Sequence, residues 1–502
     1  MTNAQPDTVS PSPWPALTIG QAKRVLEWWS ASAAFRDLVA TDPERAGQEY
    51  DLGFNPALVR PLWDHAYHLD PANKERPQHP VVAEYRAYYN KKTRWRDEIK
   101  AECASDDPRF KTWRARQIAR NSMENGHYDS GIIHAPLAIE LSDGCSVGCW
   151  FCGVGATRLK ENWPYSAENA TLWRGALTVL RRKIGAGSKW GFCYWATDPL
   201  DNPDYERFAG DFADITGMYP QTTTAQAHKD PERVRALLAV SEAGGCEVNR
   251  FSVVSEALLR RIHGEYTADE MTKVEVVTQM QDATVPKANA GSFRAKAKTR
   301  EAVADLEKEK LKQVMAAART DCAQPAAQEP TMLPPGTIAC VSGFLMNMIK
   351  RTVKLISPCR ASETWPLGYI VFDERTFSDA ADLERVIEDM MATHMPLGIS
   401  ADDPVRLHPG FRLEPVRNGF RVVSDMNGLE FTRPELADYI GSIGDLVCSG
   451  DRSAGQIALS GLFRYGVPEL NTLGTLGAMF EMGLLVDAMG RIGGGSSHGE
   501  AL

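Results

Sequence analysis

Residues 140–153 of this chain read ELSDGCSVGCWFCG, and the spacing of the three cysteines in this stretch decides which fold and chemistry to expect. Iron–sulfur clusters are held by cysteine thiolates, and a [4Fe-4S] cluster bound by protein at all four irons needs four ligands. This loop supplies three, Cys145, Cys149 and Cys152. We expect them to hold three corners of the cluster and to leave one iron open. Gly144 and Gly148 would let the backbone wrap closely around it.

An iron without a protein ligand can chelate the amino and carboxylate groups of S-adenosylmethionine. An electron passed through the cluster into the sulfonium then breaks a carbon–sulfur bond and yields a 5′-deoxyadenosyl radical, which is chemistry of the cofactor. The alternative is a structural zinc site, but zinc takes four ligands, usually from paired C-x2-C units, and the sequence has no second pair. The loop therefore predicts a [4Fe-4S] cluster that binds S-adenosylmethionine.

The composition is that of an ordinary globular protein without an excess of positive charge. The chain has 502 residues, of which 43% are hydrophobic and 24% charged, and its net charge is −9. No apolar run is long enough to cross a bilayer, and the polar, Pro-rich start lacks both regions of a signal peptide. We expect a cytoplasmic protein that binds neither membranes nor nucleic acid.

Strand-like and helical segments alternate after the cysteine loop, which favours an α/β fold with a partial or full (βα) barrel. The expected helices include residues 172–184, 231–243 and 382–393. The strand candidates are residues 137–141, 190–195, 221–226, 247–254, 337–344 and 352–357.

The predicted domains follow from changes in these patterns along the chain. They are a disordered tail (1–13), an N-terminal helical module (14–130), a barrel domain (131–404) with an inserted linker and helix (286–335), a winged-helix-like domain (405–489) and a flexible tail (490–502).

The cysteine loop resembles the CxxxCxxC signature of the radical S-adenosylmethionine superfamily, so the barrel is expected to be of radical SAM type. The resemblance includes an aromatic residue, Phe151, before the third cysteine, and implies that Phe151 lies near the adenine; the alternative is simple packing beside the cluster. Where many members carry a GGE-like turn, this chain departs from the pattern with Thr197 and Asp198. These side chains can accept a hydrogen bond from the cofactor's ammonium group or can cap a helix.

Two further side chains are candidates for binding the cofactor. Arg250 and Ser252 share one face of a predicted strand, where a guanidinium and a hydroxyl can bind the cofactor's carboxylate and ribose. A salt bridge within the barrel is the alternative.

Four stretches of the chain resemble the proteusin-type peptide epimerases, which convert L-residues to D-residues in ribosomally made precursor peptides. They are residues 35–52 with 57–64, the cysteine loop, residues 195–205 and residues 353–369. The resemblance implies that the adenosyl radical removes an α-hydrogen and that a second hydrogen arrives from the opposite face. Cysteine is a good donor because its S–H bond is weak and can be presented at short range in a shielded site.

Cys359 is the candidate hydrogen donor, because it ends the predicted strand 352–357 and precedes an aromatic-rich loop. Cys340 is the alternative, and a structural role stays open for both. The remaining cysteines show no clustered spacing, so we expect packing roles and no auxiliary cluster: Cys103, Cys193, Cys246, Cys322 and Cys448.

The expected partners follow from the epimerase hypothesis. Three short strands and three helices within residues 412–487 resemble a winged-helix module that accepts the leader of a precursor peptide along a strand edge. A cap that binds nothing is the alternative. An electron donor such as flavodoxin or ferredoxin is also expected. The other functions to weigh are a radical enzyme that crosslinks peptides and a non-catalytic iron–sulfur or zinc scaffold.

Overall fold

The computed structural model describes residues 14–73, 75–321 and 336–487, which form two compact units. Unit 1 holds the described residues up to 94 together with 251–285 and 313–321, and unit 2 holds 95–250, 286–312 and 336–487. The predictions for both terminal tails, for the end of the insert and for Cys322 fall outside the described residues. Within the described part, no helix has the length and apolar character needed to cross a membrane.

Unit 1 begins with short helices whose starts are set by side-chain caps. Thr18 and Gln21 form a capping box at the first helix, Ser32 caps the second, and Asp42 caps the third. The caps fix three closely spaced helix starts, as the N-terminal sequence predicts. The helices and strand of this unit are α1 (Ile19–Ala31), α2 (Ala33–Thr41), α3 (Pro43–Glu49), α4 (Arg60–Trp63), the first part of α5 (Pro80–Glu102), α10 (Glu256–Glu265) and β6 (Val274–Thr278).

A buried charge network joins α1 to α10 within unit 1. The Glu27 carboxylate bonds to Lys23 on the same helix and lies 2.8 Å from Nε2 of His263. Burial would raise the pKa of the Glu27 carboxyl, but Lys23 and His263 hold that pKa at about 2. Since the carboxylate is 7% exposed, its removal would leave both partners buried without it.

The change Glu27→Gln should lower the free energy of unfolding of unit 1 by about 3 kcal/mol. Hydrogen exchange of α1 and α10 in the full chain measures this loss. The matched control is Glu49→Gln, which breaks an exposed pair with Arg45 and should cost less than about 1 kcal/mol. The Glu27 contribution is fully present above about pH 4.3, the ordinary pKa of Glu, and should fade as the pH drops towards 2. Equal protection in the two variants would contradict the prediction.

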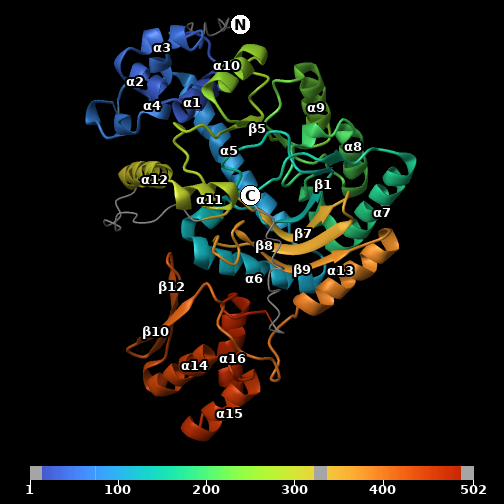
Figure 1. The fold of residues 1–502 in the computed structure, drawn as a ribbon. Helices are drawn as coiled ribbons and strands as arrows, with labels where there is room; N and C mark the ends of the chain where they lie inside the picture. Colours follow the sequence, from blue (N-terminus) through green and yellow to red (C-terminus); the bar gives the residue numbers. More distant parts are fainter. Residues whose placement is uncertain (1–13, 74, 322–335, 488–502) are drawn as a thin grey trace, which may run out of the picture. The chain divides into compact units, whose positions relative to one another are not determined.

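Unit 2 is built on a four-stranded sheet in the order β1-β7-β8-β9. Strand β1 (Ala135–Glu140) pairs in parallel with β7 (Val341–Asn347), and β8 (Thr352–Pro358) and β9 (Tyr369–Thr376) follow as antiparallel neighbours (Figure 1). Because β8 runs back along β7, the chain after Pro358 returns to the edge at which β1 begins. The cysteine loop leaves from the opposite end of β1.

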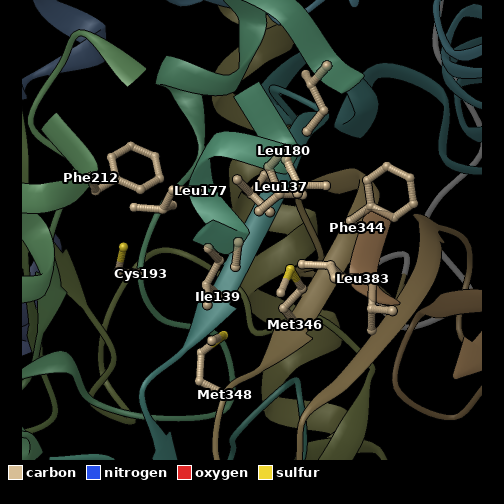
Figure 2. Close-up of a cluster of buried hydrophobic side chains, with 14 of the residues drawn as sticks. Leu137, Ile139, Leu177, Leu180, Cys193, Phe212, Phe344, Met346, Met348 and Leu383 are labelled. Atoms are coloured by element: carbon tan, nitrogen blue, oxygen red, sulfur yellow. The ribbon is translucent and has the colours of Figure 1, made fainter. Parts of the chain in front are cut away.

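Helices cover one face of this sheet and bury its apolar side chains (Figure 2). Leu137, Ile139, Phe344 and Met346 point into this core. The covering helices are α6 (Pro108–Asn125), α7 (Ala167–Ile184), α8 (Tyr205–Thr216) and α13 (Ala380–His394). The other face carries a smaller apolar cluster that includes Ala138 and faces the cysteine loop.

The remaining short strands form further, separate sheets. In the described residues, the strands do not close into a barrel. Strand β2 (Ser142–Asp143) pairs with β3 (Glu161–Asn162) across the base of the cysteine loop. Strand β4 (Thr223–Thr224) precedes α9 (Pro231–Ala243), and β5 (Asn249–Val253) runs from unit 2 into unit 1. The mixed α/β class is confirmed, while the full barrel is not formed.

Three expectations about these elements are wrong. The predicted strand 190–195 is a 3-10 turn (Gly185–Trp190) followed by one bridge, in which Phe192 bonds to the Leu137 carbonyl and the Ile139 N–H of β1. The ladder ends there, and the Ala196 N–H bonds to the Glu140 carboxylate. Strands β6 and β9 were not expected. The insert holds two helices, α11 (Gly291–Thr299) and α12 (Glu301–Asp321), where one was expected.

The C-terminal part of unit 2 has three strands and then three helices, as the sequence predicts. An antiparallel meander has the order β10-β11-β12 and packs on the helices through Phe420, Val422, Tyr439 and Ile440. The elements are β10 (Arg412–Val416), β11 (Gly419–Val423), β12 (Gly428–Thr432), α14 (Ala437–Ser449), α15 (Ala454–Tyr465) and α16 (Glu469–Glu481). The domain limits and the leader-binding role stay predictions.

Candidate functional site

The cysteine loop follows β1 and is closed by its own backbone. The Cys145 N–H donates to the Thr157 carbonyl over 2.9 Å, and the Leu159 N–H donates to the Cys145 carbonyl over 3.2 Å. Gly144 and Gly148 both have positive φ, at 88° and 64°, and a Cβ on Gly144 would collide with the Arg158 carbonyl. These glycines therefore permit the tight wrap that the sequence predicts.

The three thiols of the loop lie close enough to influence one another. Burial raises the pKa of Cys149 to about 12, and the charges of Cys152 and Cys145 add to the rise. Burial raises the pKa of Cys145 to about 11, and the backbone N–H groups of Val147 and Gly148 oppose the rise. The Ala156 N–H points at Sγ of Cys152, 3.3 Å away.

This donor set fits an iron–sulfur cluster in chemistry, because it offers three thiols and a backbone N–H directed at the sulfur of Cys152. No group of three His, Cys, Asp or Glu side chains in the described residues is already arranged around a metal position. The thiols would therefore have to lose their protons and draw together as a cluster is inserted.

Two aspartates in the segment after residue 195 hold neighbouring backbone, and one of them, Asp201, supports the cysteine loop. Asp201 accepts a hydrogen bond from the Ser146 N–H over 2.8 Å and one from Nε2 of Gln226 over 2.7 Å. Asp198 accepts from Oγ1 of Thr224 and from the N–H of Ala225, both over 2.8 Å. Asp201 was missed by sequence analysis, since its partner Ser146 lies 55 positions away.

Removing the Asp201 carboxylate by Asp201→Ala should weaken cluster retention. The Ser146 N–H, inside the cysteine loop, would lose its acceptor. Loss of such a supporting contact typically lowers metal affinity by roughly tenfold or more. Titration of reconstituted protein with an iron chelator, followed by absorbance, measures the change. Asp230→Ala removes the cap of α9 instead and should leave retention unchanged. Identical chelator curves for the two variants would contradict the role of Asp201.

Helix α11 of the insert lies against the outside of the loop. The Ser292 N–H donates to the Cys152 carbonyl over 2.9 Å, and Gly291, at φ 55°, brings the backbone so close that a Cβ would collide with that carbonyl. Phe151 packs on the cluster of Phe293 and Ala297. The aromatic side chain predicted to lie near the adenine thus contacts the insert here.

A small cavity of about 170 Å³ separates the loop from the open face of the sheet. Its polar lining combines Glu140 and Asn347 with Lys350 and Lys354. Glu140 accepts hydrogen bonds from Nδ2 of Asn347 over 3.0 Å and from the Ala196 N–H over 2.9 Å. Carboxylate and ammonium groups together suit a zwitterionic ligand, and none of these residues was expected from the sequence.

The residues predicted to contact the cofactor come from two segments, 197–198 and β5. Thr197 is buried, and its hydroxyl donates to the Asp198 carbonyl over 3.4 Å. Burial raises the pKa of Asp198 to about 6, against the hydrogen bonds that it accepts. Arg250 and Ser252 share the less buried face of β5, but Arg250 belongs to unit 2 and Ser252 to unit 1. Their roles stay predictions.

Cys340 precedes β7 and packs at the edge of the apolar cluster that faces the loop. Burial raises the pKa of its thiol to about 11, and the charge of Arg250 opposes the rise. Tyr194 packs on the same cluster and donates to Oε1 of Gln221 over 2.6 Å. Cys340 therefore has polar neighbours as well as apolar ones.

Cys359 lines a larger cavity of about 750 Å³. The thiol is 2% exposed, and burial raises its pKa well above the ordinary value, with Glu124 adding to the rise. Asn289 and Arg294 of the insert form one wall, and His408 and Asp425 of the C-terminal part form another. The cavity therefore joins the residue predicted as hydrogen donor to the region predicted to bind the leader.

An ion pair on α6 fixes the backbone on both sides of Cys359. Arg120 donates to Glu124 over 2.9 Å and to the Pro358 carbonyl over 2.7 Å. Glu124 in turn accepts from the Arg360 N–H over 2.9 Å. The Arg and Glu four residues apart are visible in the sequence, but their partners are more than 200 positions away, so sequence analysis did not find them.

The fold and the loop together define a mixed α/β protein with a three-cysteine ligand loop on the first strand of its main sheet. The chain is 34% identical over 453 residues to the uncharacterized protein y4wI of Sinorhizobium fredii, covering 88% of this chain and 82% of that protein. It belongs to the same protein family as y4wI.

Two further comparisons add little. No protein-family model matches the chain. Among solved structures, BtrN in complex with AdoMet and 2-DOIA is 14% identical, with 28% of this chain and 55% of BtrN covered and a TM-score of 0.22. A likeness of this extent bears on neither the fold nor the ligands of this chain.

Proposed function

We propose that this chain is a radical S-adenosylmethionine enzyme. The observation that carries the proposal is the loop of Cys145, Cys149 and Cys152, which offers three neighbouring thiols and a backbone N–H aimed at the sulfur of Cys152. When bound, a [4Fe-4S] cluster with S-adenosylmethionine on its open iron supplies a 5′-deoxyadenosyl radical.

The chain's own residues hold and shield this chemistry. Gly144 and Gly148 shape the loop, Asp201 fixes its backbone, and Ser292 covers its far side. The small cavity beside the loop brings Glu140 together with Lys354, which suits the amino and carboxylate groups of the methionine moiety. Lys354 pairs with Glu374 over 3.0 Å, so a bound carboxylate would share its ammonium group with that side chain.

The reaction we propose is peptide epimerisation. The α-hydrogen of an L-residue in a precursor peptide would pass as a hydrogen atom to the 5′-deoxyadenosyl radical, which becomes 5′-deoxyadenosine, and the Cys359 S–H bond would break to return a hydrogen atom to the opposite face of the α-carbon. The sulfur is left as a thiyl radical, which one electron from the donor protein and one proton restore to the thiol. Cys359 lies at the sheet edge where β1 begins, but its cavity of about 750 Å³ extends to Arg294 of α11, a helix whose Ser292 N–H bonds to the Cys152 carbonyl. A buried thiol that keeps its proton in this cavity supports the role. Cys340 is the alternative donor.

The test is anaerobic reconstitution followed by turnover in heavy water with a precursor peptide encoded beside the gene. Release of 5′-deoxyadenosine is expected, with a mass gain of one unit per epimerised residue as solvent deuterium enters through the thiol. A loss of two hydrogens would indicate crosslinking instead. No 5′-deoxyadenosine from a reduced cluster would rule out the radical mechanism.

A further inference from the structure

We propose that α11, together with Trp150 of the cysteine loop, forms the docking surface for an acidic electron-transfer protein of the flavodoxin or ferredoxin kind. This inference rests on the proposed function, which requires an electron at the loop. It goes beyond that function by assigning the place where the donor binds. We call this surface the α11 surface and define it by Trp150, Lys296, Lys298 and Arg300.

The charge of the segment around α11 differs from that of the whole chain. Residues 286–300 read PKANAGSFRAKAKTR, with five basic residues and no acidic one, in a protein of net charge −9. Such a concentration of one sign attracts a partner of the opposite sign and speeds the encounter. An acidic partner therefore has one preferred face to approach.

The positive charge of α11 is only partly neutralised. Glu363 pairs with Lys298 over 2.7 Å and with Arg294 over 3.0 Å. In the part of the chain that the structure describes, Lys296 and Arg300 have no acidic partner. Nζ of Lys296 instead lies 5.2 Å from the centre of the Trp150 ring. The surface thus keeps cationic groups available to a partner.

Trp150 gives the α11 surface an apolar centre within the cysteine loop itself. It stands between Cys149 and Cys152 in the sequence and is 39% exposed, although the large apolar side chains of unit 2 are mostly buried. An exposed aromatic residue surrounded by charged residues is typical of protein interfaces. The interfaces between redox partners are small in area. A donor seated here would approach the loop that holds all three thiols.

A partner bound at the α11 surface would lie directly beside the cysteine loop. Gly291 and Ser292 at the start of α11 lie against the Cys152 carbonyl, and Phe293 lies 6.2 Å from Trp150 between ring centres. In the step that the surface serves, the reduced donor loses one electron and the cluster gains it, with no other group transferred. A bound donor would need no long path through the protein.

The experiment measures binding of a purified acidic flavodoxin to the reconstituted full chain, at low and high ionic strength. The test variant is Lys296→Glu/Lys298→Glu/Arg300→Glu. The control variant reverses three exposed arginines on the C-terminal part, Arg417→Glu/Arg433→Glu/Arg464→Glu, and has the same net charge. We expect the test variant to bind roughly tenfold or more weakly, the control to bind within about twofold of wild type, and high salt to remove the difference.

Two outcomes would overturn the docking surface: equal weakening in both triple variants, or unchanged binding in the test variant. Iron and sulfide content must match wild type in both, which separates docking from cluster assembly. Turnover with dithionite as reductant distinguishes the two proposals, because the test variant should then release 5′-deoxyadenosine at the wild-type rate. If wild type itself releases none with dithionite, the proposed function fails, whereas weak binding of the donor alone rejects only the surface.

Discussion

Replacing Cys149 by alanine should abolish both cluster assembly and 5′-deoxyadenosine release. Two thiols cannot hold a [4Fe-4S] cluster that is already one protein ligand short, and Cys149 lies between the other two thiols in the loop. Anaerobic reconstitution should give a protein without the charge-transfer absorbance of a cluster, and 5′-deoxyadenosine should fall to the detection limit.

The control for this loss is Cys448→Ala, which removes an exposed cysteine on α14. That variant should keep the cluster and the activity of wild type. Electron paramagnetic resonance of the reduced proteins gives a readout that does not depend on turnover. A wild-type cluster signal in the Cys149 variant would remove the basis of the proposed function.

The change Cys359→Ser should separate hydrogen abstraction from hydrogen return. Serine keeps the volume of the buried side chain, but its O–H bond is too strong to give a hydrogen atom to a carbon radical. We expect release of 5′-deoxyadenosine to continue, while deuterium-labelled D-residues fall by roughly a hundredfold or more. Mass spectrometry and chiral analysis of the hydrolysed peptide measure both.

Cys340→Ser is the matched variant, because Cys340 is the alternative donor and its thiol also keeps its proton. If the Cys340 variant loses labelled product and the Cys359 variant keeps it, Cys340 is the hydrogen donor and the proposed epimerisation still holds. If neither loses it, hydrogen return comes from elsewhere. Thermal unfolding of each variant controls for a structural role, since a cysteine that only packs would lower stability without changing the product ratio.

The elements that sequence analysis predicted well are those with strong local patterns. Helix α9 agrees at both ends, and α7 and α13 differ by a few residues, because Pro, Asp or Ser caps and an apolar stripe define them locally. The segment 190–195 was wrongly predicted as a strand because its aromatic residues suit one, whereas only Phe192 bonds to β1 and the N–H of Ala196 turns to the Glu140 carboxylate. Strand β9 was missed since its half beyond Val371 is charged and only partly buried.

The same distinction applies to the site. The cysteine loop and its glycines could be predicted because their chemistry lies within 14 consecutive residues, 140–153. The supports of that loop, Asp201 and Ser292, come from other segments and become neighbours only through the fold. Spacing along one chain contains no signal for such contacts.

Helix α6 connects the C-terminal strands to the backbone around Cys359 within unit 2. Besides Arg120 and Glu124 at Cys359, it offers the Met123 carbonyl to the Ser424 hydroxyl over 2.6 Å and the Ser122 carbonyl to Nδ2 of Asn427 over 2.8 Å. One turn of α6, residues 120–124, is thus hydrogen-bonded both to the end of β11 and to the segment after β8. A leader that displaced the C-terminal strands would therefore also displace α6, and with it the backbone on both sides of Cys359.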